Sequence, residues 1–335
     1  MNFKFKKKGV NNADETFEQD VSYTAENTEA GNASVALAKQ ESKARTIWRT
    51  NWEGWMFVFP LFIGLAMFTV YPMIQSLIWS LYHYEGMTYE WIGFGNFAEI
   101  FASPVFGKVF VNTIYYTFVS VPISLVTSYL LACLVNMKIK GVGAFRVIYY
   151  LPCVIPGVVG GLLWKDMFDA QGFFNTILAE FGTSSEFFTS DDPYTAISSI
   201  FLMNIWGIGG GMILWLSAFK SIPGQLYEAA RIDGASRFRQ LISITIPMSM
   251  SMIFFNVVTM LVGTLQYNGT LTFASGGGKG ARNALYMWGV MIYIEAFGQS
   301  NFGYASALSW VLMVFIGIIT AILFGSRRFL YMGDE

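Results

Sequence analysis

Charged side chains are scarce in this chain. Asp, Glu, Lys and Arg make up 13% of its 335 residues, about half of the roughly 25% usual in soluble globular proteins. Too little charge is available to coat a water-exposed surface, so we expect lipid to cover part of the chain. The net charge of −1 also excludes a broadly basic nucleic-acid-binding protein.

Side chains suited to catalysis or metal binding are equally rare. His83 is the single histidine. The sequence therefore disfavours a Ser-His-Asp triad, a histidine metal site and histidine acid–base catalysis. The two cysteines, Cys133 and Cys153, form neither a disulfide framework nor a metal-ligand spacing. The apolar stretches described next hold no Glu and no paired carboxylates, which disfavours an intramembrane enzyme. We expect no catalytic residue, no metal site and no cofactor in this chain.

Apolar and aromatic residues are abundant instead, at 54% and 17%. A helix needs about 20 residues to cross roughly 30 Å of hydrocarbon, and six apolar stretches reach that length. We therefore predict an all-α polytopic membrane protein with a six-helix domain at 51–330. Residues 1–50 are polar and predict a disordered or loose tail, and 331–335 form a short C-terminal end. The stretches are 55–82, 109–137, 147–168, 195–219, 248–269 and 304–325.

The distribution of Lys and Arg predicts the orientation. Four alternate segments carry 17 of the 21 basic residues, whereas 169–194 carries none. Basic residues favour the cytoplasmic side of a membrane, so we expect both termini to be cytoplasmic. The basic segments are 1–54, 138–146, 220–247 and 326–335.

The cytoplasmic segment 220–247 has the pattern of a helical hairpin. It reads KSIPGQLYEAARIDGASRFRQLISITIP. Gly234 can take a left-handed conformation and end a first helix, Ser236 can cap a second, and Pro247 opens the fifth span. This composition fits either a rigid hairpin that docks into a partner protein or an ordinary amphipathic linker at the membrane surface.

The spacing of residues in this segment resembles the EAA loop of ABC-importer permeases. Ile246 stands where the usual pattern has Leu. Further segments resemble the carbohydrate, maltose-type branch of that family, including Asn96-Phe97, Leu151-Pro152 and 303–307. The positions that match the EAA loop are Glu228, Ala229, Ala230, Gly234, Ile244, Ile246 and Pro247.

This resemblance implies the type I importer permease core with a cytoplasmic coupling hairpin at 220–247. It implies the translocation subunit of an ATP-driven, binding-protein-dependent sugar importer, with an oligosaccharide as solute, working by alternating access in a bacterial-type cytoplasmic membrane. The expected partners are a second homologous permease, two ATPase subunits that hold ATP and Mg²⁺, and an extracytoplasmic solute-binding protein. Residues expected to contact the ATPase are Glu228, Ala229, Ala230, Asp233, Gly234 and Pro247.

Other solutes and another function stay open at this point. The same machinery would serve a sugar phosphate, an acidic oligosaccharide or a peptide. An ATP-independent channel or a membrane scaffold is a further alternative.

Polar residues within the spans indicate a candidate solute path. Asn256, Thr264 and Asn268 recur at multiples of four residues, with Tyr267 beside them, and helical spacing places such residues on one face. Asn204 and Gly207 lie on another span, near Trp206. The resemblance adds Cys153 and Gly157. Asn, Thr and Gly also join membrane helices to one another, so a packing role stays open for each.

Overall fold

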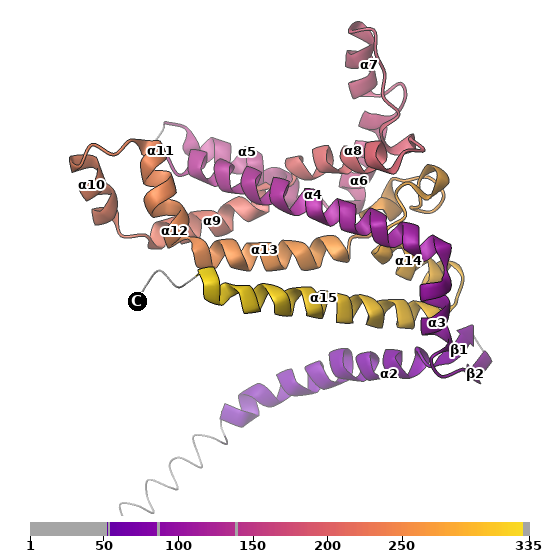
Figure 1. Ribbon diagram of the computed structural model, residues 1–335. Helices are drawn as coiled ribbons and strands as arrows, with labels where there is room; N and C mark the ends of the chain where they lie inside the picture. Colours follow the sequence, from indigo (N-terminus) through magenta and orange to yellow (C-terminus); the bar gives the residue numbers. More distant parts are fainter. Residues whose placement is uncertain (1–51, 53, 86–87, 138–139, 331–335) are drawn as a thin grey trace, which may run out of the picture. The chain divides into compact units, whose positions relative to one another are not determined.

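The computed structural model describes residue 52 and residues 54–85, 88–137 and 140–330 (Figure 1). The described residues fall into two units, one that ends at Ile74 and one that begins at Gln75. The predicted tail at 1–50 and the C-terminal end at 331–335 lie outside the described residues.

Three helices are long and apolar enough to cross a membrane without a break. The first is Gly54–Trp79, which contains η1 (Ala66–Val70) and α2 (Tyr71–Trp79). The second is α4 (Pro104–Val135), and the third is Phe302–Ser326 within α15 (Phe302–Leu330). The start of α4 follows from its sequence, because Ser103 caps the helix by accepting a hydrogen bond from the Phe106 amide.

Two of the other three predicted spans, 147–168 and 195–219, are wrong as single helices, because each is a pair of segments set at an angle. The third, 248–269, consists mostly of the single helix Met250–Leu265, which forms a bent pair with the segment before it. Pro156 lacks a donor and keeps Ile155 extended, which explains one break. Gly207 lies in the second break and Ser249 in the third. Six spans result if each pair crosses as one. The pairs are Val142–Val154 with Gly157–Glu180 at 98°, Pro193–Trp206 with Gly209–Ser221 at 52°, and Arg237–Met248 with Met250–Leu265 at 70°.

These pairs consist of nine named elements. The first contains α5 (Val142–Val154), α6 (Gly157–Phe168) and α7 (Phe173–Glu180). The second contains α8 (Pro193–Trp206), which follows η2 (Phe187–Thr189), and α9 (Gly209–Ser221). The third contains α11 (Arg237–Gln240), η3 (Leu241–Thr245), α12 (Ile246–Met248) and α13 (Met250–Leu265).

No described residue of the first unit is buried, and its large apolar side chains are exposed. Phe57 and Leu61 are both largely exposed, and the rings of Trp55 and Phe62 lie 6.1 Å apart. An apolar helix without buried side chains has the surface expected for contact with lipid.

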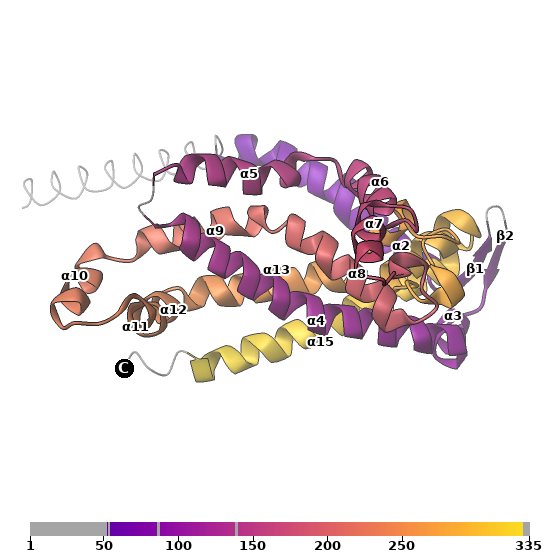
Figure 2. The same ribbon diagram turned by 90° about the horizontal axis from the view of Figure 1, so that it is seen from above.

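The second unit is built around α4, which packs against α8, α9 and α13 (Figures 1 and 2). One apolar cluster surrounds Trp288, whose ring lies 5.0 Å from that of Phe106. A second surrounds Trp215, whose ring lies 5.0 Å from that of Tyr129. The two clusters hold α4 in place along its length.

The two ends of this unit carry different structures (Figure 1). One end carries α10 (Gly224–Ile232), followed by α11. The other carries α3 (Gly95–Ala102) and an antiparallel hairpin of β1 (Tyr82–Glu85) and β2 (Thr88–Trp91). The chain is therefore helical as predicted, with a small hairpin that the sequence analysis did not predict.

The connection after α13 contains short helices that were not predicted from the sequence. It forms η4 (Gly269–Thr272), η5 (Ala281–Asn283), α14 (Trp288–Tyr293) and η6 (Ile294–Gly298). Trp288 and Val290 are almost completely buried, so α14 belongs to the core.

Candidate functional site

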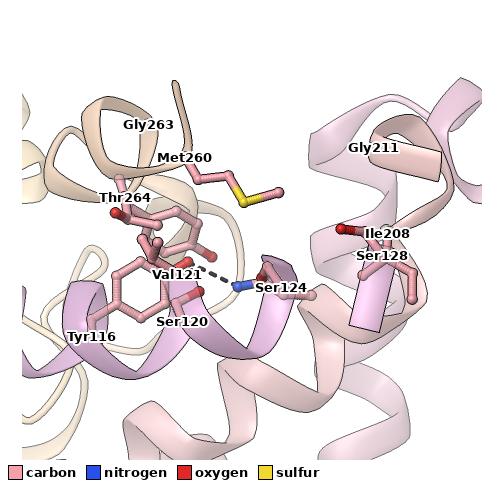
Figure 3. A pocket seen from close by; sticks show the side chains of 13 residues that line it. Tyr116, Ser120, Val121, Ser124, Ser128, Ile208, Gly211, Met260, Gly263 and Thr264 are labelled. Atoms are coloured by element: carbon pink, nitrogen blue, oxygen red, sulfur yellow. Dashed lines mark hydrogen bonds between the residues drawn. The ribbon is translucent and has the colours of Figure 1, made fainter. Parts of the chain in front are cut away.

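A chamber of about 330 Å³ opens between α4, α8, α9 and α13 (Figure 3). None of its 13 lining residues is charged, and hydroxyl, amide and aromatic groups alternate with glycine and aliphatic side chains. Such groups can bind the hydroxyls and the apolar ring faces of a neutral polar solute. The lining is Tyr116, Ser120, Val121, Ser124, Ser128, Asn204, Gly207, Ile208, Gly211, Met260, Gly263, Thr264 and Tyr267.

A stripe on α4 supplies much of the polar lining. Tyr116, Ser120, Ser124 and Ser128 follow one another at four-residue intervals and share one helix face (Figure 3). Ser128 also accepts a hydrogen bond from the Trp215 indole at 3.1 Å, which ties it to α9. This stripe was not predicted from the sequence, although serine at every fourth position of an apolar span indicates a polar helix face.

The break between α8 and α9 supplies a second side of the chamber. Asn204 Nδ2 donates a hydrogen bond to the Tyr116 hydroxyl at 2.9 Å, drawn as a dashed line in Figure 3. Gly211 also lines the chamber, and a Cβ there would lie 3.3 Å from Ser128 Cβ. Gly207 lies between them in the break. The glycines thus keep the wall thin beside the serine stripe.

Tyr267 closes the third side, just beyond the end of α13. Its ring lies 4.8 Å from that of Tyr116. Its hydroxyl oxygen is buried and has no hydrogen-bond partner within the part of the chain that the structure describes. A buried hydroxyl without a partner costs free energy, so this atom has an unused capacity to bind solute or water. Thr264 lines the same side.

Two of the predicted path residues on this segment lie elsewhere. Asn256 is buried and donates to the Met252 carbonyl of its own helix at 2.9 Å. Helix α13 ends at Leu265, so the predicted helical face does not reach Asn268, which lines a neighbouring cavity with Gln266.

The remaining three predicted path residues also lie outside the chamber lining. Trp206 packs edge-on against Trp164 at 5.7 Å. Cys153 donates from Sγ to the Gly207 carbonyl at 3.4 Å, and a Cβ added at Gly157 would meet open space out to 4 Å. Of the nine predicted path residues, Asn204, Gly207, Thr264 and Tyr267 are brought together at the chamber.

A buried asparagine on α4 holds the connection after α13. Asn112 Nδ2 lies 3.1 Å from the Asn283 carbonyl oxygen and 3.2 Å from those of Ala284 and Tyr286. The neighbouring Thr113 Oγ1 accepts a hydrogen bond from the Trp288 amide at 2.9 Å. These bonds attach a segment more than 170 positions away in sequence to the helix that carries the serine stripe.

The predicted coupling hairpin has the expected turn and cap. Helix α10 begins at Gly224, with Pro223 at its N-cap, and Gly234 has φ +75°. Ser236 Oγ then accepts a hydrogen bond from the Arg239 amide at 3.3 Å. Glycine is favoured at a positive φ and serine at a helix N-cap, so the local sequence accounts for this geometry.

The motif residues occupy both ends of this hairpin. Glu228 and Ala229 are exposed on α10, Ala230 is half-buried, and Asp233 is the exposed C-cap of the helix. Pro247 lies in α12.

The hairpin is joined to the core by a side-chain contact. The hydroxyls of Tyr227 and Thr245 lie 3.0 Å apart and link α10 to η3. Ile222 at the end of α9 is buried in the cluster around Trp215, and Tyr227 packs against that cluster. The hairpin is therefore anchored to the helices that wall the chamber.

A helical bundle with a polar chamber between its spans and a hairpin at one end is the architecture expected of a membrane permease. The chain belongs to the family described as "Binding-protein-dependent transport system inner membrane component", which matches residues 92–331. The predicted family is confirmed. The chain is thus a multi-pass membrane permease component and is not itself the catalytic subunit of its transporter.

Individual relatives cover most of the chain. It is 32% identical to "Probable ABC transporter permease protein YesP" of Bacillus subtilis over 89% of this chain and 96% of that protein. It is 33% identical to "Lactose transport system permease protein LacF" of Rhizobium radiobacter over 82% and 94%. A crystal structure of a bacterial ABC transporter that imports the acidic polysaccharide alginate has a chain with the same fold. Its TM-score is 0.74 at 23% identity, over 86% of this chain and 98% of that one.

Proposed function

We propose that this chain is the translocation subunit of an ATP-driven, binding-protein-dependent importer whose solute is a neutral oligosaccharide. The observation that carries the proposal is the uncharged chamber, with its serine stripe, the Asn204 amide and two tyrosine rings. A charged solute in a low-dielectric site needs an opposite charge. A neutral sugar needs hydrogen-bonding groups and flat apolar surfaces, and the lining has both.

The names of two similar proteins bear on whether the solute is neutral or acidic. LacF is named for the transport of lactose, a neutral disaccharide. The structurally similar alginate transporter imports an acidic polysaccharide, but its similarity to this chain extends to the fold alone. The chamber here has no Lys or Arg in its lining, which favours the neutral class.

The coupling hairpin would link this chamber to ATP hydrolysis. Glu228, Ile232 and Phe238 are exposed, the latter two at 86% and 71%. Exposed apolar side chains beside charged ones are typical of a surface that docks into a partner. The partner is an ATPase subunit, one of two, and these subunits hold ATP and Mg²⁺.

Alternating access then follows from the attachment of the hairpin. Closure of the ATPases on ATP would move the hairpin, and the Tyr227–Thr245 contact would transmit that movement through η3 to α13. Packed helices shift as rigid bodies between two arrangements, so the chamber would open to one side of the membrane at a time. A second, homologous permease would form the opposite wall, and a solute-binding protein would deliver the sugar.

The proposed location is a bacterial-type cytoplasmic membrane with both termini in the cytoplasm. The excess of Lys and Arg in segments such as 220–247 supports this orientation. It places the coupling hairpin on the side where ATP is available.

The test uses the complex purified from its native membrane by a tag on this chain and reconstituted in nanodiscs. ATPase activity is measured with the co-purified binding protein and two probe sets, neutral di- and trisaccharides against uronic oligosaccharides and sn-glycerol 3-phosphate. We expect stimulation by a neutral sugar. Stimulation by the acidic probes alone would overturn the neutral class, and recovery of the chain without an ATPase would overturn the importer.

A pair of serine variants tests the chamber itself. Ser124→Ala removes a lining hydroxyl, whereas Ser217→Ala removes an exposed hydroxyl that donates to the Ile213 carbonyl on α9. We expect the first variant to raise the sugar concentration needed for half-maximal transport, and the second to leave it unchanged. Equal behaviour of the two variants would exclude the serine stripe from the solute path.

A further inference from the structure

The hairpin of β1 and β2 has two chemically different faces. Its register pairs Tyr82 with Trp91 and Tyr84 with Tyr89. Side chains alternate between the faces of a strand, so these four aromatic residues share one face. The opposite face carries two further cross-strand pairs, His83 with Glu90 and Glu85 with Thr88.

The side-chain contacts agree with this division. On the aromatic face the rings of Tyr84 and Tyr89 stack at 4.1 Å, and those of Tyr82 and Trp91 meet edge-on at 5.0 Å. On the polar face His83 Nε2 lies 3.5 Å from a carboxylate oxygen of Glu85. The hairpin is amphipathic across its thickness.

The hairpin is held rigidly to its neighbours. Asn96 is buried on α3, and its Nδ2 donates hydrogen bonds to the carbonyls of Ser80 and Tyr82, both at 2.9 Å. Gly303 in the first turn of α15 lets the hairpin approach closely, since a Cβ there would lie 2.2 Å from the Tyr82 oxygen. Asn96 and Gly303 both belong to segments that resemble the family, and the transport proposal gives neither a role.

The aromatic face lies at the ends of two membrane helices. The ring of Tyr84 is 5.1 Å from that of Trp79, the last residue of the first span. It is 5.3 Å from that of Phe302, the first residue of the last span. The hydrocarbon boundary is therefore close to this face.

The β2 half of the aromatic face is left uncovered. Tyr89 is 57% exposed and Trp91 is 61% exposed. Tyrosine and tryptophan are enriched at the membrane–water interface, where the ring is apolar and its polar atom can bond headgroups or water. An exposed pair of this kind, fixed beside two span ends, has the position and chemistry of an interfacial anchor.

We propose that the β1–β2 hairpin is a lipid anchor whose aromatic face enters the headgroup layer while its polar face contacts water. The occupant of the uncovered face is the lipid surface, because that face continues the boundary set by Trp79 and Phe302. The rigid attachment through Asn96 and Gly303 keeps this face beside Trp79 and Phe302, the residues at which the two spans end. This inference is independent of the solute and of the coupling hairpin.

The test places one spin label at a time in the full-length chain, in its complex in nanodiscs, after replacing Cys133 and Cys153 with alanine. The labelled variants are Tyr89→Cys and Trp91→Cys on the aromatic face, with His83→Cys and Glu90→Cys as matched controls on the polar face. Collision rates with oxygen, which concentrates in lipid, and with a water-soluble nickel chelate report the surroundings of each label.

We expect the oxygen-to-nickel ratio to alternate along the strands and to be several-fold higher at positions 89 and 91 than at 83 and 90. A ratio that does not alternate would overturn the anchor. A second outcome would also overturn the anchor: the nickel chelate reaches the labels at 89 and 91 freely, and addition of the co-purified binding protein then protects them. That outcome would assign the aromatic face to a protein partner.

A second measurement avoids the cysteine substitutions. The fluorescence of Trp91 is obtained as the difference between the wild type and Trp91→Phe. We expect lipids brominated near the headgroup to quench this difference. Quenching by acrylamide from the water phase, without quenching by the brominated lipids, would refute the proposal.

Discussion

The substitution Asn112→Leu tests whether one amide on α4 holds the connection after α13. Leucine has a similar size and no donor. The substitution removes an Nδ2 group that lies 3.1 to 3.2 Å from three carbonyl oxygens. An amide has only two hydrogens, so at least two of these three bonds share one.

The expected loss is about 1–3 kcal/mol. Two hydrogen bonds contribute about 0.5–1.5 kcal/mol each, while polar contacts between membrane helices average about 0.6 kcal/mol. Because about 1.4 kcal/mol corresponds to a tenfold change in an equilibrium, local opening of 281–288 should become roughly 5- to 150-fold more frequent.

Hydrogen–deuterium exchange read by mass spectrometry provides the assay. Informative amides include those of Leu285, which donates to the Lys279 carbonyl, and Trp288, which donates to Thr113. The control is Asn175→Leu, because Asn175 Nδ2 holds the Asp169 and Ser185 carbonyls in the same way at 3.0 Å. The control should accelerate exchange around 170–187 only. If the amides of 281–288 exchange at the same rate in Asn112→Leu as in the wild type, Asn112 does not hold this connection.

Three further predictions concern coupling, packing and charge. Glu228→Lys should abolish transport and ATPase association while the permease stays inserted, and normal co-purification of the ATPase would contradict the hairpin assignment. Gly209→Ala would place a Cβ 1.9 Å from the Tyr149 carbonyl oxygen, so its melting temperature should fall by several degrees, whereas Gly157→Ala, with open space, should leave it unchanged. Burial raises the pKa of the Glu295 carboxyl above 4.5; the stability that its protonated form confers is therefore lost as pH rises from about that value. Glu295→Gln should match the wild type in melting temperature at pH 4 and exceed it at pH 7, and parallel pH profiles would count against this titration.

The positions of apolar segments could be predicted because crossing a membrane depends on continuous hydropathy. All six stretches correspond to a helix or a bent helix pair. The breaks were harder to predict, because Pro and Gly within membrane helices are often tolerated. The backbone breaks at Pro156 and Gly207, whereas Pro122 lies inside an unbroken α4. Whether such a residue bends a helix depends on its neighbours in space.

The chamber was predicted only in part, for a related reason. Asn204 and Thr264 are conspicuous polar residues in apolar spans, and both line it. Asn256 is equally conspicuous, yet its side chain bonds within its own helix. The four-residue spacing from Ser120 to Ser128 predicts that these serines share one helix face. Which surroundings that face meets depends on where α9 and α13 pack.

Local sequence alone was sufficient for the helical character, the turn at Gly234, the cap at Ser236 and the resemblance to the importer family. The helical character, the turn and the cap depend on residues within a few positions of one another, and the resemblance depends on the order and spacing of residues along the chain. The contacts of Asn112 with 283–286, of Asn96 with Tyr82 and of Gly303 with β1 were decided by tertiary structure. A buried asparagine shows in sequence that a hydrogen-bond partner is needed, but only the packing of distant helices determines which carbonyl meets that need.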